Sequence, residues 1–242
     1  YYYWGALLWT VPLSIASVPL EIGYNLIVAL IGGMVASLLW MLGRRAGGSH
    51  LSGLLVAFFG LFAGTPDGLR QLFEGKPIGG LDLWPSSRQI ADTITEFPLL
   101  TMHLGDLHPH LLSMPIACLA LLVAWQAGRA GPKILQTVVL AVLFGVAWAG
   151  NPWSMPPTLV GIALLLFAGP DRWYWPGGNG TRRWLAVAAI AVGGWLVTAP
   201  FFCASPAMSS TDTPLPSRWE AMPSKAPMVT TPVPPIPVRR MP

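Results

Sequence analysis

The chain has 242 residues, of which 53% are hydrophobic and only 10% are charged. A soluble domain carries about 25% charged residues, so this composition excludes an ordinary soluble enzyme, whose water-facing surface needs more charge. The high apolar content also excludes a disordered protein. The formal net charge is +4, but the 14 basic residues form no basic stripe, so nucleic acid is not an expected partner. These figures predict an integral membrane protein that contacts the lipid bilayer.

The first twenty residues, Tyr1–Leu20, open with a run of aromatic side chains and contain two prolines, Pro12 and Pro19. Aromatic side chains with a polar tip favour the headgroup level of a bilayer. We therefore expect a short interfacial or re-entrant helix here. The alternative is the end of a transmembrane helix.

Six apolar segments follow in chain order and predict an all-α, polytopic helical membrane protein with about six spans. They are Ile22–Leu42, Leu51–Ala63, Leu111–Trp125, Ile134–Trp148, Thr158–Ala168 and Trp184–Phe202. A helix needs about 20 apolar residues to cross the hydrocarbon core. The first and last segments have this length, whereas the middle ones are shorter and need flanking residues to complete a crossing.

The basic residues predict the orientation, because cytoplasmic loops carry an excess of Lys and Arg. Three gaps between the apolar segments hold seven of the 14 basic residues, namely Arg44 and Arg45, then Arg129 and Lys133, then Arg172, Arg182 and Arg183. We therefore expect loops 43–50, 128–133 and 170–183 in the cytoplasm. Loops 64–110 and 149–157 then lie outside a prokaryotic cell membrane, and loop 64–110 holds six of the ten acidic residues.

The composition changes after residue 203. The last 39 residues, from Ala204 to Pro242, contain ten prolines and no apolar period. Proline at this density disfavours helix and strand. The sequence therefore predicts a helical membrane domain over 1–203 and a Pro-rich tail over 204–242, which is either disordered or not the native continuation.

Polar chemistry gathers at the end of the predicted outer loop, where His103, Asp106, His108 and His110 fall within eight residues. The residues allow three functional interpretations. In the first, the group holds a divalent metal ion through Asp106, His103 and His108. In the second, it works in acid–base catalysis, with Asp106 or His108 as the catalytic group. In the third, it binds a lipid-linked phosphate together with Arg88. The structural alternative is that these side chains cap a helix and hold the loop in place.

Four further residues are candidates on the same predicted face. The guanidinium of Arg88 suits an anion such as phosphate, unless it pairs with a neighbouring acid. Glu96 stands before an apolar run and is a candidate second carboxylate. Asn151 and Trp153 lie in the short outer loop, where Trp153 either stacks on a sugar ring or belongs to the aromatic belt.

Several of these motifs resemble one known family, the YYY membrane proteins (domain of unknown function 2298). The matching residues are Tyr1–Gly5, Tyr24–Leu26, Ser86–Ile90, Glu96–Pro98 and Gly105–His110. The resemblance covers roughly Tyr1 to Phe202. The chain also matches a family motif at Asn151, Trp153, Pro157 and Thr158, but it has Ser154 where the family has Asp.

The resemblance implies a distant similarity to membrane glycosyltransferases of the GT-C type. It implies transfer of a sugar from a polyprenyl-phosphate donor at the outer face. In that scheme Asp106, Glu96 and His108 are catalytic, and Arg88, His110, Trp153 and Asn151 bind substrate. Family members extend beyond both ends of this chain, which therefore resembles an interior fragment that is inactive alone. The alternatives are a non-catalytic membrane binding or assembly subunit, or a metal-dependent membrane hydrolase.

Overall fold

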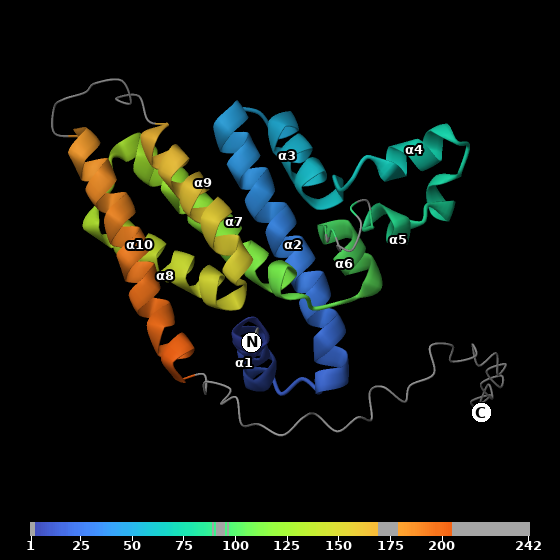
Figure 1. Cartoon of the computed structure of the whole chain (residues 1–242), viewed down its shortest axis with the longest axis horizontal. Helices are drawn as coiled ribbons and strands as arrows, with labels where there is room; N and C mark the ends of the chain where they lie inside the picture. The colour runs from blue at the N-terminus through green and yellow to red at the C-terminus, as the bar shows by residue number, and fades with distance from the viewer. Residues whose placement is uncertain (1–2, 89, 91–94, 96, 169–178, 205–242) are drawn as a thin grey trace, which may run out of the picture. The chain divides into compact units, whose positions relative to one another are not determined.

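A computed structural model describes residues 3–88, 90, 95, 97–168 and 179–204 (Figure 1). Within these ranges the chain is helical and contains no strand, which confirms the predicted all-α fold. Glu96, part of the predicted loop 170–183 and the Pro-rich tail lie outside the described residues.

Ten α-helices make up the described chain, with short 3₁₀ turns at Ile78–Gly80 and Pro152–Ser154. The helices are α1 (Tyr3–Ile15), α2 (Leu20–Gly47), α3 (His50–Phe62), α4 (Asp67–Phe73), α5 (Leu83–Ser86), α6 (Pro98–Leu104), α7 (Pro109–Ala130), α8 (Ile134–Gly150), α9 (Met155–Phe167) and α10 (Asn179–Ala204).

Three helices are long and apolar enough to cross a membrane, namely Leu20–Gly47, Pro109–Ala130 and Gly180–Pro200 within α10. A fourth crossing is formed if α3 and α4 count as one broken span or re-entrant loop, because a 92° bend separates them. Helices α1, α8 and α9 are apolar but shorter. All six predicted apolar segments are therefore helical, and the count of six spans stays a prediction.

The predicted loops are shorter than the sequence indicated, because the helices continue through the basic residues. Helix α2 includes Arg44 and Arg45 and ends at Gly47, and the following residue, Gly48, adopts a left-handed conformation with φ 71°. Helix α7 likewise includes Arg129, and α10 begins at Asn179, before Arg182 and Arg183. Cations at a helix C-terminus are favoured by the helix dipole, and their long stems cover apolar surface. Loops 43–50 and 170–183 are thus largely helical where described, whereas residues 131–133 of the predicted loop 128–133 are not helical.

Helix α1 packs against α7 and α8. Trp9 is 7% exposed, and its indole N–H donates to the backbone carbonyl of Leu112 at 3.0 Å. The helix expected over Tyr1–Leu20 therefore exists at Tyr3–Ile15, and Trp9 packs in a core with Ile27, Ile31 and Leu111. Its interfacial or re-entrant position stays a prediction.

Glycine allows the helices of the bundle to approach closely. A Cβ placed on Gly128 of α7 would overlap the backbone carbonyl of Leu165 in α9. Between α8 and α10, a Cβ on Gly145 would lie 2.8 Å from the carbonyl oxygen of Gly194. Small residues at helix contacts are typical of membrane bundles, in which van der Waals packing drives association. These contacts surround a core that includes Phe144 and Ile162.

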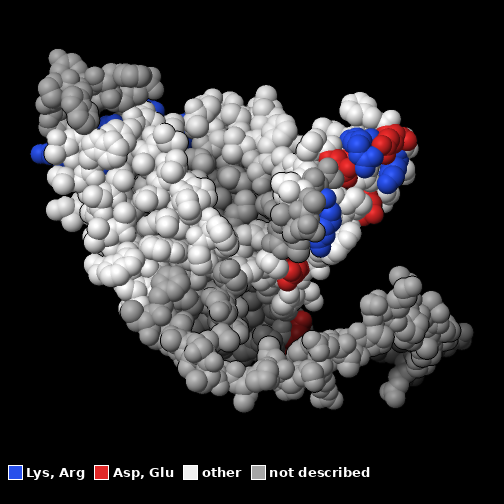
Figure 2. All heavy atoms as spheres, in the orientation of Figure 1, with Lys and Arg blue, Asp and Glu red and all other residues white. Residues whose placement is uncertain are grey.

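Residues 64–88, which contain α4 and α5 and are called the charged segment below, lie to one side of α2 in Figure 1. Figure 2 shows a face that is mostly uncharged, with acidic and basic side chains gathered over α4 and α5 and a few basic ones near the start of α10. Because charge is costly in the hydrocarbon layer, we treat α4, which carries Asp67 and Arg70, as lying outside the spans.

The close contact at Gly128 predicts a strong effect of a single methyl group. Gly128→Ala forces α7 away from α9, and we expect it to lower the free energy of unfolding by about 1–3 kcal/mol. Gly33→Ala is the matched control, because nothing lies within 4 Å of a Cβ at this position in α2. The control should raise stability by up to about 1 kcal/mol, since alanine favours a helix. Denaturant unfolding in mixed micelles measures both, and equal stability of the two variants would contradict the packing.

Candidate functional site

The candidate site begins where α6 ends and α7 begins. Helix α6 terminates at Gly105, whose φ of 65° reverses the chain direction. Pro109 occupies the first turn of α7, where its missing N–H costs nothing. Between them, the backbone N–H of Leu107 donates to the hydroxyl of Tyr24 on α2 at 3.0 Å. This bond holds the segment 105–108 against the start of α2.

Asp106 and His108 form a pair in this segment. Nδ1 of His108 lies 2.7 Å from Oδ2 of Asp106, and the two side chains are 42% and 50% exposed, respectively. His108 is also the residue that precedes the first turn of α7. A carboxylate that bonds one imidazole nitrogen fixes the orientation of the ring. The pair can therefore accept a proton from a group at the protein surface.

His110 belongs to a neighbouring polar network that links α6, α7 and the start of α9. Its Nε2 lies 3.0 Å from the hydroxyl of Thr101. Its backbone carbonyl accepts a hydrogen bond from Ser113, whose hydroxyl lies 3.0 Å from that of Ser154. The side-chain amide of Asn151 donates to Ser154 at 3.0 Å. The rings of His108 and His110 are 5.5 Å apart, so the pair and the network are neighbours.

Ser154, the residue at which the chain departs from the family motif, has a structural role. It replaces the Asp that the resemblance implies, and it joins Ser113 on α7 to Asn151 at the end of α8. Asn151 is 7% exposed and also accepts from the backbone N–H of Trp153. These contacts hold the connection between α8 and α9.

The side chains of His103, Arg88 and Trp153 add no hydrogen bond to this group among the described residues, and Glu96 lies outside them. His103 is exposed on α6. The Arg88 guanidinium stacks on the Trp84 ring at 4.4 Å from its centroid, and Trp153 is 80% exposed. Among the described residues, no three His, Cys, Asp or Glu side chains are placed to hold a metal ion. The predicted metal set of Asp106, His103 and His108 is therefore not assembled, and only Asp106 and His108 are paired.

A buried carboxylate, which the sequence patterns did not single out, organises the charged segment. Asp67 is 3% exposed. Its Oδ2 accepts from Gln71 at 2.7 Å and from Ser86 at 2.8 Å, and its Oδ1 accepts from Arg70 at 2.9 Å. These donors hold the pKa of Asp67 below its usual value. Gln71 in turn bonds the backbone of Asp82, so this cluster ties α4 to α5. In the sequence, only the spacing of Asp67 and Gln71, which lie one helical turn apart, indicates that their side chains can form a hydrogen bond.

The Asp67 cluster yields a stability prediction for the segment 64–88. Asp67→Leu leaves Gln71 and Ser86 without their acceptor, and an unsatisfied buried donor is costly. We expect faster proteolysis within 64–88 in the detergent-purified protein. Glu74→Gln removes an acid that is 50% exposed and should leave the rate unchanged. Equal cleavage rates in both variants would show that Asp67 does not hold the segment.

Comparison with known proteins gives one match. The family described as "Uncharacterized membrane protein (DUF2298)" matches residues 1–229. The match runs past Phe202 into the Pro-rich region, farther than the motifs indicated. No curated protein and no solved structure matches the chain.

Proposed function

We propose that this chain, which belongs to the DUF2298 family of uncharacterized membrane proteins, is part of a GT-C-like glycosyltransferase. It would transfer a sugar from a polyprenyl-phosphate donor to an acceptor hydroxyl at the outer membrane face. The observation that carries the proposal is the Asp106–His108 pair, with its 2.7 Å contact at the start of a long apolar helix. Helix α7 is long and apolar enough to cross a membrane, so a pair at its N-terminal end would lie where a lipid-linked substrate is presented.

In the proposed reaction the Asp106–His108 pair is the general base. The acceptor O–H proton passes to the pair while the acceptor oxygen bonds to C1 of the sugar. The bond from C1 to the phosphate oxygen breaks, and the electron pair leaves on the lipid phosphate. The carboxylate of Asp106 stabilises the imidazolium that forms on His108.

The remaining candidates would serve binding. The helix N-terminus of α7 favours an anion through its N–H groups and dipole, and Arg88 supplies a planar fork for the donor phosphate. The exposed ring of Trp153 would stack on a sugar. Asn151 and His110, which are linked through Ser154 and Ser113, would bind the substrate from one hydrogen-bonded network. Glu96 would be an auxiliary acid.

A non-catalytic membrane subunit that docks a partner is the second candidate. It is favoured by large apolar side chains exposed on the charged segment, namely Leu69 (60%), Phe73 (90%), Ile78 (79%) and Trp84 (56%). Exposed apolar groups beside charged ones are typical of an interaction surface.

The test is made in membranes that contain the protein, with a lipid-linked sugar donor. We expect Asp106→Asn and His108→Gln each to lower the transfer rate by about 100-fold or more, the usual contribution of a general base. Glu74→Gln, an exposed acid on the charged segment, is the control and should transfer sugar normally. Transfer at the control rate by both pair variants would remove the catalytic role and leave the docking candidate.

A further inference from the structure

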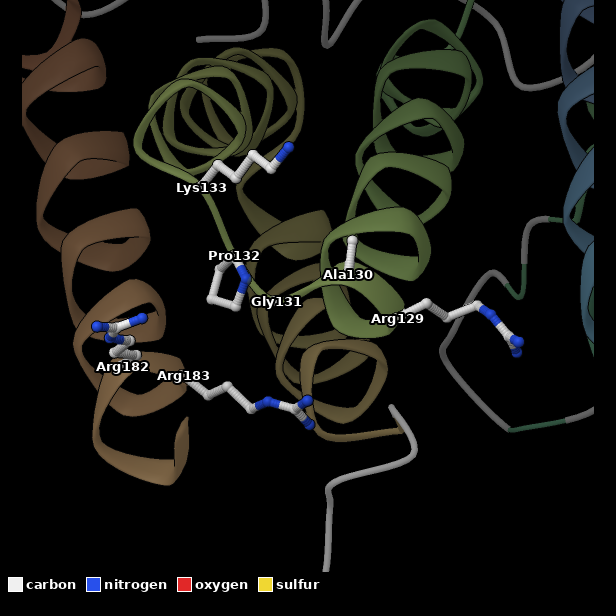
Figure 3. A pocket seen from close by; sticks show the side chains of 7 residues that line it. All are labelled: Arg129, Ala130, Gly131, Pro132, Lys133, Arg182 and Arg183. Carbon is white, nitrogen blue, oxygen red and sulfur yellow. The ribbon is translucent and has the colours of Figure 1, made fainter. Parts of the chain in front are cut away.

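The opposite end of α7 contains a basic hollow that the proposed function does not use. It has a volume of about 270 Å³ and lies between the ends of α7, α8 and α10 (Figure 3). Its lining includes Arg129, Gly131, Pro132, Lys133, Arg182 and Arg183, and no acidic side chain from the part of the chain that the structure describes. In Figure 3 Arg183 extends from α10 toward the end of α7, whereas Arg129 points away from α10. The other basic residues of the lining are Lys133, Arg182 and Arg183.

Arg183 is the residue that points to a ligand. It is only 3% exposed. Its Nη2 donates to the backbone carbonyl of Gly128 at 3.3 Å, but its buried Nη1 has no hydrogen-bond partner among the described residues. A buried guanidinium with an unsatisfied donor is costly unless an anion compensates it. The guanidinium geometry suits two oxygens of a phosphate.

An apolar groove continues directly from this hollow. It has a volume of about 610 Å³ and shares Pro132, Lys133 and Arg182 with the basic hollow. Its further lining is mostly apolar and comes from one face each of α8 and α10, namely Ile134, Thr137, Val138, Leu185, Ala186 and Ala189. A basic end joined to an apolar groove matches a ligand with an anionic head and a hydrocarbon chain.

We propose that this end of the bundle binds an anionic phospholipid, with its headgroup phosphate against Arg183, Arg182 and Lys133 and one acyl chain in the groove. Basic pockets between transmembrane helices are known to bind such headgroups. The residues around the hollow also suit a lipid layer, since Ile134 is 85% exposed, Leu135 74% and Trp184 54%. The inference stands on different residues from the proposed glycosyl transfer, and either can fail without the other.

The experiment titrates the purified full chain, in neutral detergent, with phosphatidylglycerol or with phosphatidylcholine of the same acyl chains. We expect saturable binding of phosphatidylglycerol only. The double variant Lys133→Gln/Arg182→Gln changes two exposed side chains and should weaken binding about fivefold per basic residue removed. Arg183→Gln should weaken it further, because it removes the buried cation. Arg44→Gln/Arg45→Gln removes the same charge from exposed positions on α2 and should leave the dissociation constant unchanged.

Three results would overturn the proposal. Equal binding of the two lipids would mean that the headgroup charge is not recognised. Equal weakening by the Arg44/Arg45 control pair would mean that only overall charge matters. Inorganic phosphate that binds as tightly as phosphatidylglycerol would assign the hollow to a free anion, because the groove would then contribute nothing.

Discussion

Gly128 is the position on which the packing of three helices depends. Its missing side chain lets α7 approach the backbone of Leu165 in α9, and its carbonyl accepts the hydrogen bond from Arg183 in α10. A larger residue would separate α7 from α9 and move the acceptor of a buried cation. In a bilayer the hydrophobic effect between helices is weak, so close van der Waals contact of this kind must hold the bundle. The basic hollow lies beside this contact, between the ends of α7, α8 and α10.

The Asp106–His108 pair and the basic hollow lie at opposite ends of α7. Its N-terminal end carries the Asp106–His108 pair and the network of His110, and its C-terminal end borders the hollow with Lys133 and Arg183. A helix of 22 residues is about 33 Å long, enough to cross the hydrocarbon core. Within the described residues, the charged side chains lie at or near helix ends and in the segment 64–88, as expected where charge is costly in the hydrocarbon layer.

The sequence predicted what depends on local pattern and missed what depends on packing. Long apolar runs predicted the helices, because a helix that crosses a bilayer needs a minimum number of apolar residues. Pro109 predicted the start of α7, because proline is favoured in the first turn of a helix. The helix ends were misplaced at Arg44 and Arg182, because apolar runs stop at a charge while the backbone continues. The burial of Asp67 and Arg183 could not be predicted, since it arises from residues distant in sequence, Ser86 and Gly128. The Asp106–His108 contact was predictable because the two residues are neighbours.

The central claim is that the two chemistries lie on opposite sides of the membrane, and α8 tests it most directly. With 17 residues it is about 25 Å long, short for a span, and Lys133 precedes it while Trp153 follows it. Single cysteines, Lys133→Cys and Trp153→Cys, are placed in a background with Cys118 and Cys203 replaced by Ala and treated with an impermeant maleimide in intact cells. We predict labelling of Trp153→Cys in intact cells and of Lys133→Cys only after permeabilisation. Labelling of both from the same side would contradict the account.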